Sequence, residues 1–140
     1  METLVLITAT ADPTAPGSSA PTADEERPAG ALGSWLPEPG TRTGRFEGAS
    51  YGSAVSCFVV DALPGTGPGL HEHPYSETFV VQAGRARFEV DGLRIDGLPG
   101  DVVVVAPETP HRFTALGAAA LQMVCIHAAA RMETTWLDGS

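Results

Sequence analysis

The chain has 140 residues and a hydrophobic content of 43 %, which is enough for one small globular core. Eight basic and seventeen acidic residues give a formal net charge of −9, which argues against a domain that binds the phosphate backbone of nucleic acid. The sequence contains no lysine, so Schiff-base catalysis and a phosphate-loop lysine are excluded.

The first part of the chain has the composition of a solvated connector. Residues 11–40 hold six of the twelve prolines and almost no β-branched or aromatic residues. We predict an N-terminal extension over residues 1–44, partly docked through the apolar segments 4–7 and 31–36. No basic residue precedes the first apolar segment and no stretch approaches 18 apolar residues, so we expect a cytoplasmic protein without a membrane span.

Residues 45–137 have the composition of an all-β domain, because short β-type runs alternate there with Gly, Pro and Asp. A two-residue hairpin is expected at Asp91-Gly92, and residues 131–137 are expected to form one terminal turn or short helix. A compact antiparallel barrel follows from this pattern. The predicted strands are Val55–Ala62, Leu70–His73, Glu77–Gln82, Ala86–Val90, Leu93–Ile95, Asp101–Val105, His111–Leu116 and Leu121–Ala128.

Two histidines stand two residues apart on one predicted strand, at His71 and His73. Side chains two apart share a face of a strand, so both imidazoles point the same way. Glu77 opens the next predicted strand, and His111 can complete the set from a distant run. Three imidazoles and one carboxylate suit Fe(II), Mn(II), Ni(II), Zn(II), Cu(II) or Co(II) and leave coordination positions open. We therefore predict one divalent transition metal per subunit.

The same residues match a family motif. The motif reads glycine, five residues, His-x-His, three or four residues, Glu, six residues and glycine. Its fixed positions are filled by Gly65, His71, His73, Glu77 and Gly84. In these residues the sequence resembles the cupin family.

The second cupin motif is matched less fully. Gly100 and His111 have the expected separation, but the expected proline is one place late, at Pro107. Glu108 stands at the glycine position of the motif, and Ala115 stands at its final asparagine position. The departures therefore affect the turn that leads to His111 more than the histidine itself.

The resemblance covers residues 45–137 and implies a single cupin domain, a double-stranded β-helix or jelly-roll barrel. The segment 71–77 looks like that of small single-domain bacterial cupins, among them dioxygenase-like proteins and cyclases of aromatic polyketides. A homodimer is expected, because cupins commonly pair and a small barrel has edge strands and apolar faces that need cover.

The substrate pocket is expected to be apolar, because the inward-facing positions carry few polar groups. A hydrophobic or aromatic small molecule is implied as the substrate. The candidate lining residues are Phe58, Val60, Phe79, Val81, Phe88, Val103, Val105, Phe113, Met123 and Cys125.

Two further side chains are candidates for proton transfer, Tyr75 and His127. His127 shares strand parity with Met123 and Cys125, so it is either a hydrogen-bonded residue at the strand end or a group of the pocket. No lysine is present to take this role.

Other motifs do not support an alternative chemistry. The GxSxG segment 48–52 precedes a β run instead of a helix and is interpreted as a loop. The glycine-rich segment 65–69 precedes no helix and reads as a flexible approach to the metal-binding strand. Cys57 and Cys125 lie in apolar runs and are expected to be buried thiols without a disulfide.

Three functions remain open from the sequence. The first hypothesis is an oxygen-dependent, dioxygenase-like enzyme with Fe(II) as the preferred metal. The second is a cyclase, isomerase or lyase that uses the metal as a Lewis acid. The third is a cupin that binds a small molecule without catalysis.

Overall fold

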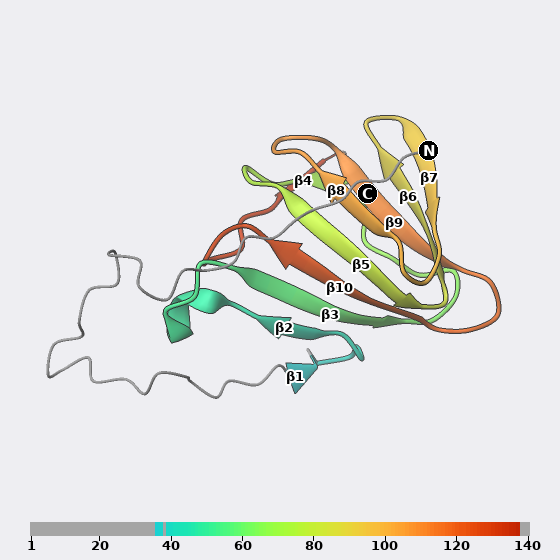
Figure 1. Ribbon diagram of the computed structural model, residues 1–140, viewed down its shortest axis with the longest axis horizontal. Helices are drawn as coiled ribbons and strands as arrows, with labels where there is room; N and C mark the ends of the chain where they lie inside the picture. The colour runs from blue at the N-terminus through green and yellow to red at the C-terminus, as the bar shows by residue number, and fades with distance from the viewer. Residues whose placement is uncertain (1–35, 38, 138–140) are drawn as a thin grey trace, which may run out of the picture. The chain divides into compact units, whose positions relative to one another are not determined.

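The structure, a computed structural model, describes residues 36–37 and 39–137. Within these residues eleven strands form two antiparallel sheets, arranged as two layers (Figure 1). One turn of 3-10 helix covers Gly48–Tyr51. The strands are β1 (Leu36–Pro37), β2 (Gly44–Phe46), β3 (Ser56–Ala62), β4 (His71–Glu72), β5 (Glu77–Ala83), β6 (Arg85–Val90), β7 (Leu93–Gly97), β8 (Val102–Val105), β9 (His111–Leu116), β10 (Leu121–His127) and β11 (Thr135–Trp136).

The strand order shows a jelly roll. One sheet has the order β1-β2-β3-β10-β5-β8 and the other has the order β11-β4-β9-β6-β7. From β3 onward the chain passes repeatedly from one sheet to the other, and only the β6–β7 hairpin stays within one sheet. The predicted all-β fold class is confirmed.

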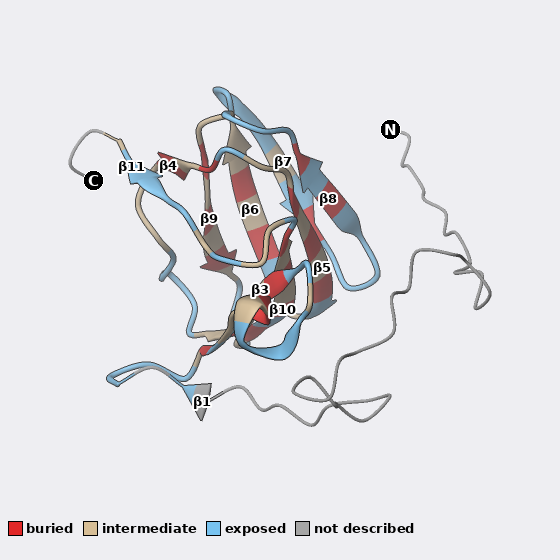
Figure 2. Cartoon of the chain, turned by 90° about the vertical axis from the view of Figure 1, so that its left-hand side faces the viewer, coloured by how far each residue is buried: buried red, intermediate tan, exposed pale blue. Residues whose placement is uncertain are grey.

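The core lies between the two sheets because the strands alternate in burial, as Figure 2 shows for β6 and β8. Three aromatic rings pack together at its centre. Phe79 makes edge contacts with Phe88 and Phe113, with 5.0 Å and 6.1 Å between the ring centroids. Phe79 and Phe88 are each 1 % exposed. Burying a side chain of this size contributes about 1.5–3 kcal/mol.

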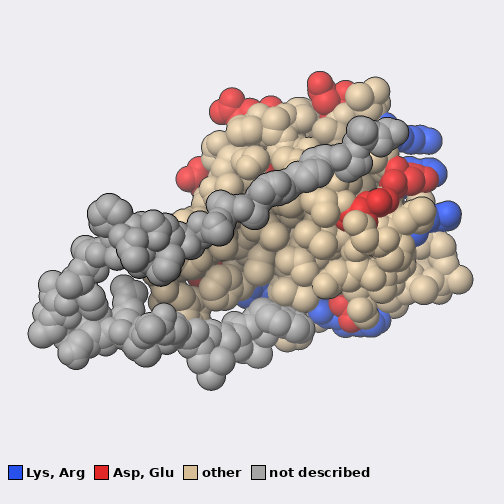
Figure 3. All heavy atoms as spheres, viewed as in Figure 1, with Lys and Arg blue, Asp and Glu red and all other residues tan. Residues whose placement is uncertain are grey.

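The β6–β7 hairpin forms where the sequence predicts it. Asp91 and Gly92 both have positive φ, 50° and 85°, which is the backbone that a two-residue hairpin of type I′ requires. Arg87 and Asp96 form an ion pair of 2.9 Å across this hairpin. Acidic and basic side chains lie close together on this side of the molecule (Figure 3).

The prediction of a terminal turn or helix over residues 131–137 is wrong. Thr135 and Trp136 form β11, which pairs with Glu72 and His71 of β4. Seven residues are too few for a helix that is stable by itself, whereas the edge of β4 offers backbone hydrogen bonds. The C-terminal segment therefore covers the strand that carries a candidate ligand.

The extension predicted over residues 1–44 lies mostly outside the described residues, as do the apolar segments 4–7 and, except for Leu36, 31–36. Of the described part, β1 pairs with β2 and extends the first sheet. The boundary at residue 45 stays a prediction. No helix in the described part of the chain is long and apolar enough to cross a membrane.

Candidate metal centre

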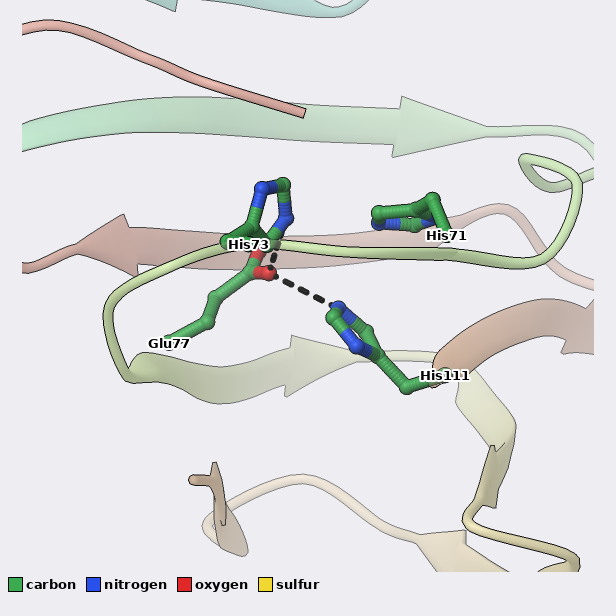
Figure 4. Close-up of side chains that lie close together, drawn as sticks. All are labelled: His71, His73, Glu77 and His111. Carbon is green, nitrogen blue, oxygen red and sulfur yellow. Dashed lines mark hydrogen bonds and ion pairs between the residues drawn. The ribbon is translucent and has the colours of Figure 1, made fainter. Parts of the chain in front are cut away.

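Four polar side chains from the two sheets lie close together (Figure 4). His71 on β4 and His111 on β9 are register partners in the five-stranded sheet. His73 follows directly after β4, and Glu77 is the first residue of β5 in the other sheet. One ligand atom from each of the four residues lies within 4.8 Å of the others. The structure thus brings together the four residues that the sequence proposes as ligands.

The cluster is buried. The exposed fractions are 7 % for His71, 4 % for His73, 4 % for Glu77 and 2 % for His111. Glu77 Oε1 lies 3.0 Å from His73 Nε2 and 3.0 Å from His111 Nε2, as the dashed lines in Figure 4 show. A buried carboxylate is costly to desolvate, so positive charge is needed beside it.

Backbone carbonyl groups set the orientation of the three imidazoles. The Nδ1 atoms of His71, His73 and His111 each lie 2.8 Å from a carbonyl oxygen. Because a carbonyl only accepts, Nδ1 carries the proton and Nε2 keeps its lone pair. These partners, which sequence reasoning missed, belong to Gly69, Glu133 and Thr109 respectively.

Burial and the close contact of Glu77 with the imidazoles shift the pKa values of the cluster in different directions. Burial lowers the pKa of His71 to about 4, so this imidazole is neutral at pH 7. Burial by itself would raise the pKa of Glu77, but the adjacent imidazoles hold that pKa well below its usual range. His73 has a raised pKa, because the effect of Glu77 and a backbone carbonyl exceeds that of burial.

The residues fit a divalent transition metal. Three Nε2 lone pairs and one carboxylate oxygen converge, which is a donor set that Mn(II), Fe(II) and their neighbours accept. His73 Nε2 is buried and lacks a hydrogen-bond partner in favourable geometry, although Glu77 Oε1 is 3.0 Å away. A cation at the centre would satisfy this atom together with the carboxylate.

The two candidates for proton transfer lie beside this cluster. His127 is 1 % exposed, and its Nε2 atom lies 3.1 Å from Glu77 Oε2. Tyr75 Oη lies 2.7 Å from His127 Nδ1. The two residues are therefore connected to each other and to the candidate ligand Glu77.

The profile of the family described as Cupin domain matches residues 58–127, which is 70 of the 140 residues. The chain belongs to the cupin family. No curated protein sequence matches the chain.

Solved structures share the cupin fold at low sequence identity. A variant of Bacillus subtilis oxalate decarboxylase has a TM-score of 0.65 and 21 % identity over 75 % of this chain and 30 % of that protein. An oxalate oxidase has a TM-score of 0.61 and 18 % identity over 68 % of this chain and 54 % of its own. A conserved Streptococcus pyogenes protein of unknown function has a TM-score of 0.51 and 20 % identity over 56 % of this chain and 68 % of that protein. The chain thus spans about a third of oxalate decarboxylase and about half of oxalate oxidase.

The loop before the first cupin histidine is tied to the barrel. Gly65 N–H donates to the carbonyl of Ala115 at 2.7 Å, and Ala115 N–H donates to the carbonyl of Thr66 at 2.9 Å. Gly67 packs so closely on the Phe113 carbonyl that a Cβ there would collide with it. The segment expected to be a flexible approach is thus held by backbone hydrogen bonds.

The departure from the second cupin motif at Glu108 has a local cost. Glu108 has a φ of 59°, in the left-handed region that favours the glycine of the motif. Its N–H donates to the carbonyl of His73 at 2.7 Å. The turn keeps the backbone that a glycine would adopt, and the ligand His111 stays in place.

A cavity of about 700 Å³ opens beside the metal centre. His71, His73, Glu77 and His127 contribute to its wall. Five of the ten predicted pocket residues line it, namely Phe58, Val60, Phe79, Phe113 and Cys125. The other five are buried in the core and are not among the lining residues, namely Val81, Phe88, Val103, Val105 and Met123.

The cavity includes residues that sequence reasoning did not assign to it. Arg42 and Asp61 form an ion pair of 2.8 Å at its wall. Trp136 lies against His71, with 5.0 Å between the ring centroids. Strand parity indicates which residues point inward. It does not show which of these residues reach the cavity, and the position of Trp136 does not follow from periodicity.

The two cysteines are free thiols, as expected. Cys125 is buried, and burial raises the pKa of its thiol well above the usual value. Cys57 is half-buried, and burial raises its pKa as well. Neither thiol is activated as a nucleophile.

Proposed function

We propose that the protein is a metal-dependent cupin enzyme that acts on a hydrophobic or aromatic small molecule. The observation that carries the proposal is the placement of the His71, His73, Glu77 and His111 cluster at an apolar cavity. When bound, the metal supplies open coordination positions for a polar group of the substrate, and it polarises that group or exchanges electrons with it. The aromatic wall binds the apolar body of the substrate and excludes water.

The character of the cavity argues against oxalate as the substrate. Oxalate is a small dianion, which needs positive side chains around it. Arg42 is the one arginine among the described residues that line the cavity, and it is paired with Asp61. We therefore propose that this protein shares with the similar structures a metal site in a jelly roll, but that its substrate is different.

Fe(II) is the metal we propose first, and Mn(II) is its nearest competitor. The imidazole and carboxylate donors accept both ions. Bacillus subtilis oxalate decarboxylase has Mn(II) centres, which supports manganese in a related fold. Metal analysis of protein purified without added metal tests the choice: zinc as the only bound metal would contradict a redox role.

Dioxygen is the co-substrate that we propose, because an apolar cavity keeps bulk water from reactive oxygen intermediates. Under strict anaerobiosis, turnover of a hydrophobic substrate should stop in the iron-loaded protein. Equal turnover without oxygen in the zinc-loaded protein would favour a Lewis-acid cyclase, isomerase or lyase. Saturable binding without turnover under either condition would indicate a binding protein.

Filling the cavity tests the substrate class. Val60→Phe adds a ring to the cavity wall, whereas Val59→Phe places the same ring on the opposite face of β3. We expect Val60→Phe to weaken binding of the fluorescent probe anilinonaphthalene sulfonate at least about tenfold while metal content stays at one per chain. Equal affinity in the two variants would contradict the assignment of the cavity.

His127 is proposed for proton transfer, because it lines the cavity and lies beside Glu77. Tyr75 is not among the lining residues, so it would act through its hydrogen bond to His127. Replacing His127 with glutamine, which cannot carry a proton, should lower turnover at least about tenfold with metal bound. An unchanged turnover would leave His127 with a structural role only.

A homodimer stays a proposal. Val102 and Val104 are exposed on β8, the edge strand of the first sheet, and a second copy could cover them. Sedimentation should give twice the chain mass of 14.5 kDa at high micromolar concentration. A single-chain mass under these conditions would contradict the dimer.

A further inference from the structure

The two oxygens of the Glu77 carboxylate face different groups. Oε1 lies 3.0 Å from the Nε2 atoms of both His73 and His111, which is the side where the candidate ligands converge. Oε2 lies 3.1 Å from Nε2 of His127 on the neighbouring strand β10. Glu77 and His127 are register partners, so the sheet holds the two backbones side by side.

Among the described residues, no group other than Glu77 is placed to form a hydrogen bond with His127 Nε2. This nitrogen is buried and has no hydrogen-bond partner in favourable geometry. Leaving a buried donor unsatisfied costs about 1–3 kcal/mol. Glu77 Oε2, at 3.1 Å, is the acceptor within reach.

Tyr75 determines which nitrogen of His127 carries the proton. The backbone N–H of Glu133 donates to Tyr75 Oη at 3.0 Å, so the hydroxyl proton of Tyr75 is free to be donated elsewhere. His127 Nδ1 is 2.7 Å away, whereas the Glu133 carbonyl is 3.2 Å away. Donation to the nearer Nδ1 leaves the proton of neutral His127 on Nε2, which faces Glu77.

We propose that Tyr75 and His127 are a positioning pair that directs an Nε2–H bond to Glu77 Oε2 and so makes Glu77 a ligand through Oε1 alone. The inference rests on the metal site of the proposed function and adds Tyr75, at a variable position of the first cupin motif, and His127, which lies outside both motifs. A carboxylate whose outer oxygen accepts a hydrogen bond is held in one orientation and takes one coordination position. The pair thereby keeps a further position open for substrate.

Co(II) binding by the purified full chain tests the pair without substrate. The variant His127→Leu removes the donor, while His127→Gln keeps an amide N–H donor near the place of Nε2. We expect His127→Leu to bind one Co(II) per chain with affinity about 10–100-fold weaker and with an altered visible spectrum, because a released Glu77 changes the coordination. His127→Gln should restore most of the affinity and the spectrum.

The role of Tyr75 is tested in the same assay. Tyr75→Phe removes only the hydroxyl, and the matched control Tyr51→Phe removes the hydroxyl of the other tyrosine in the chain. We expect Tyr75→Phe to weaken Co(II) binding in the same direction as His127→Leu and to have no further effect in the His127→Leu background. The control should match the unsubstituted protein.

The outcomes separate this inference from the proposed function. If the unsubstituted chain binds no Co(II), the metal site itself is overturned. If it binds Co(II) and His127→Leu and Tyr75→Phe both keep its affinity and spectrum, the positioning pair is overturned. Additive effects of the two substitutions would contradict a chain from Tyr75 through His127. Should His127→Leu fail to fold, His127→Gln alone and combined with Tyr75→Phe still provide the comparison.

Discussion

Two cross-strand pairs face each other at the metal centre, and they are held in different ways. His71 and His111 belong to the five-stranded sheet, and each donates Nδ1–H to the carbonyl of the residue two positions earlier. Glu77 and His127 belong to the six-stranded sheet and are held by side chains, including the hydroxyl of Tyr75.

The difference indicates which supports of the ligands a side-chain substitution can remove. A backbone carbonyl is present whatever the side chain is, so the His71–His111 half is determined by the path of the chain. The Glu77–His127 half depends on the identity of side chains that lie far apart in the sequence. Substitution of a ligand should weaken metal binding most, and substitutions at His127 should weaken it less.

The largest effect is expected from removing a ligand of the first half. His111→Ala deletes one imidazole from the donor set, and a set of three donors binds less tightly. We expect metal affinity to fall more than about 100-fold, since the loss of a ligand exceeds the 10–100-fold effect of an outer-shell partner. Elemental analysis after dialysis measures the bound metal, and His73→Ala should behave in the same way.

The matched control is the next residue on β9. Arg112 points to the other face, where its Nε lies 3.3 Å from Glu89. Arg112→Ala should keep one metal per chain, and all three variants should keep the β-type circular dichroism spectrum. Metal content at the unsubstituted level in both histidine variants would contradict the ligand assignment.

The sequence predicts strands and candidate ligands in both halves. The runs that become β5, β6, β9 and β10 are close to the observed strands, because inward and outward residues alternate along them. The spacing of His71 and His73 indicates a shared direction, and the structure brings both into the cluster although β4 ends at Glu72. Local periodicity and motif spacing carry this information.

The contacts between segments far apart in the sequence could not be predicted in the same way. The Tyr75–His127 contact spans 52 residues of sequence, and its existence depends on the register of β10 with β5. The strand β11 was missed because two residues show no periodicity, and its position depends on the exposed edge of β4. Contacts set by tertiary packing leave no local pattern in the sequence.

The second prediction concerns the loop that leads into the first half. Gly67→Ala places a Cβ against the Phe113 carbonyl, so the loop must move away from β9. We expect the free energy of unfolding to fall by about 1–3 kcal/mol, as for other overpacked sites. Urea denaturation measures the change. Gly40→Ala, at a φ of 81° with no heavy atom within 4 Å, measures the cost of backbone strain without a steric clash. An unchanged free energy of unfolding in Gly67→Ala would contradict the steric argument.

The smallest effect is expected at the turn before His111. Glu108 has a φ of 59°, which costs a residue with a Cβ about 1–2 kcal/mol, whereas glycine adopts it freely. Glycine in turn loses about 0.5–1 kcal/mol more conformational entropy on folding, so Glu108→Gly should stabilise the protein by about 0–1.5 kcal/mol. Asp91→Gly, at a φ of 50°, should gain less, because aspartate tolerates this region better than glutamate. Thermal unfolding of both variants measures the difference, and a clear destabilisation by Glu108→Gly would show that the Glu108 side chain contributes more to the turn than its strained backbone costs.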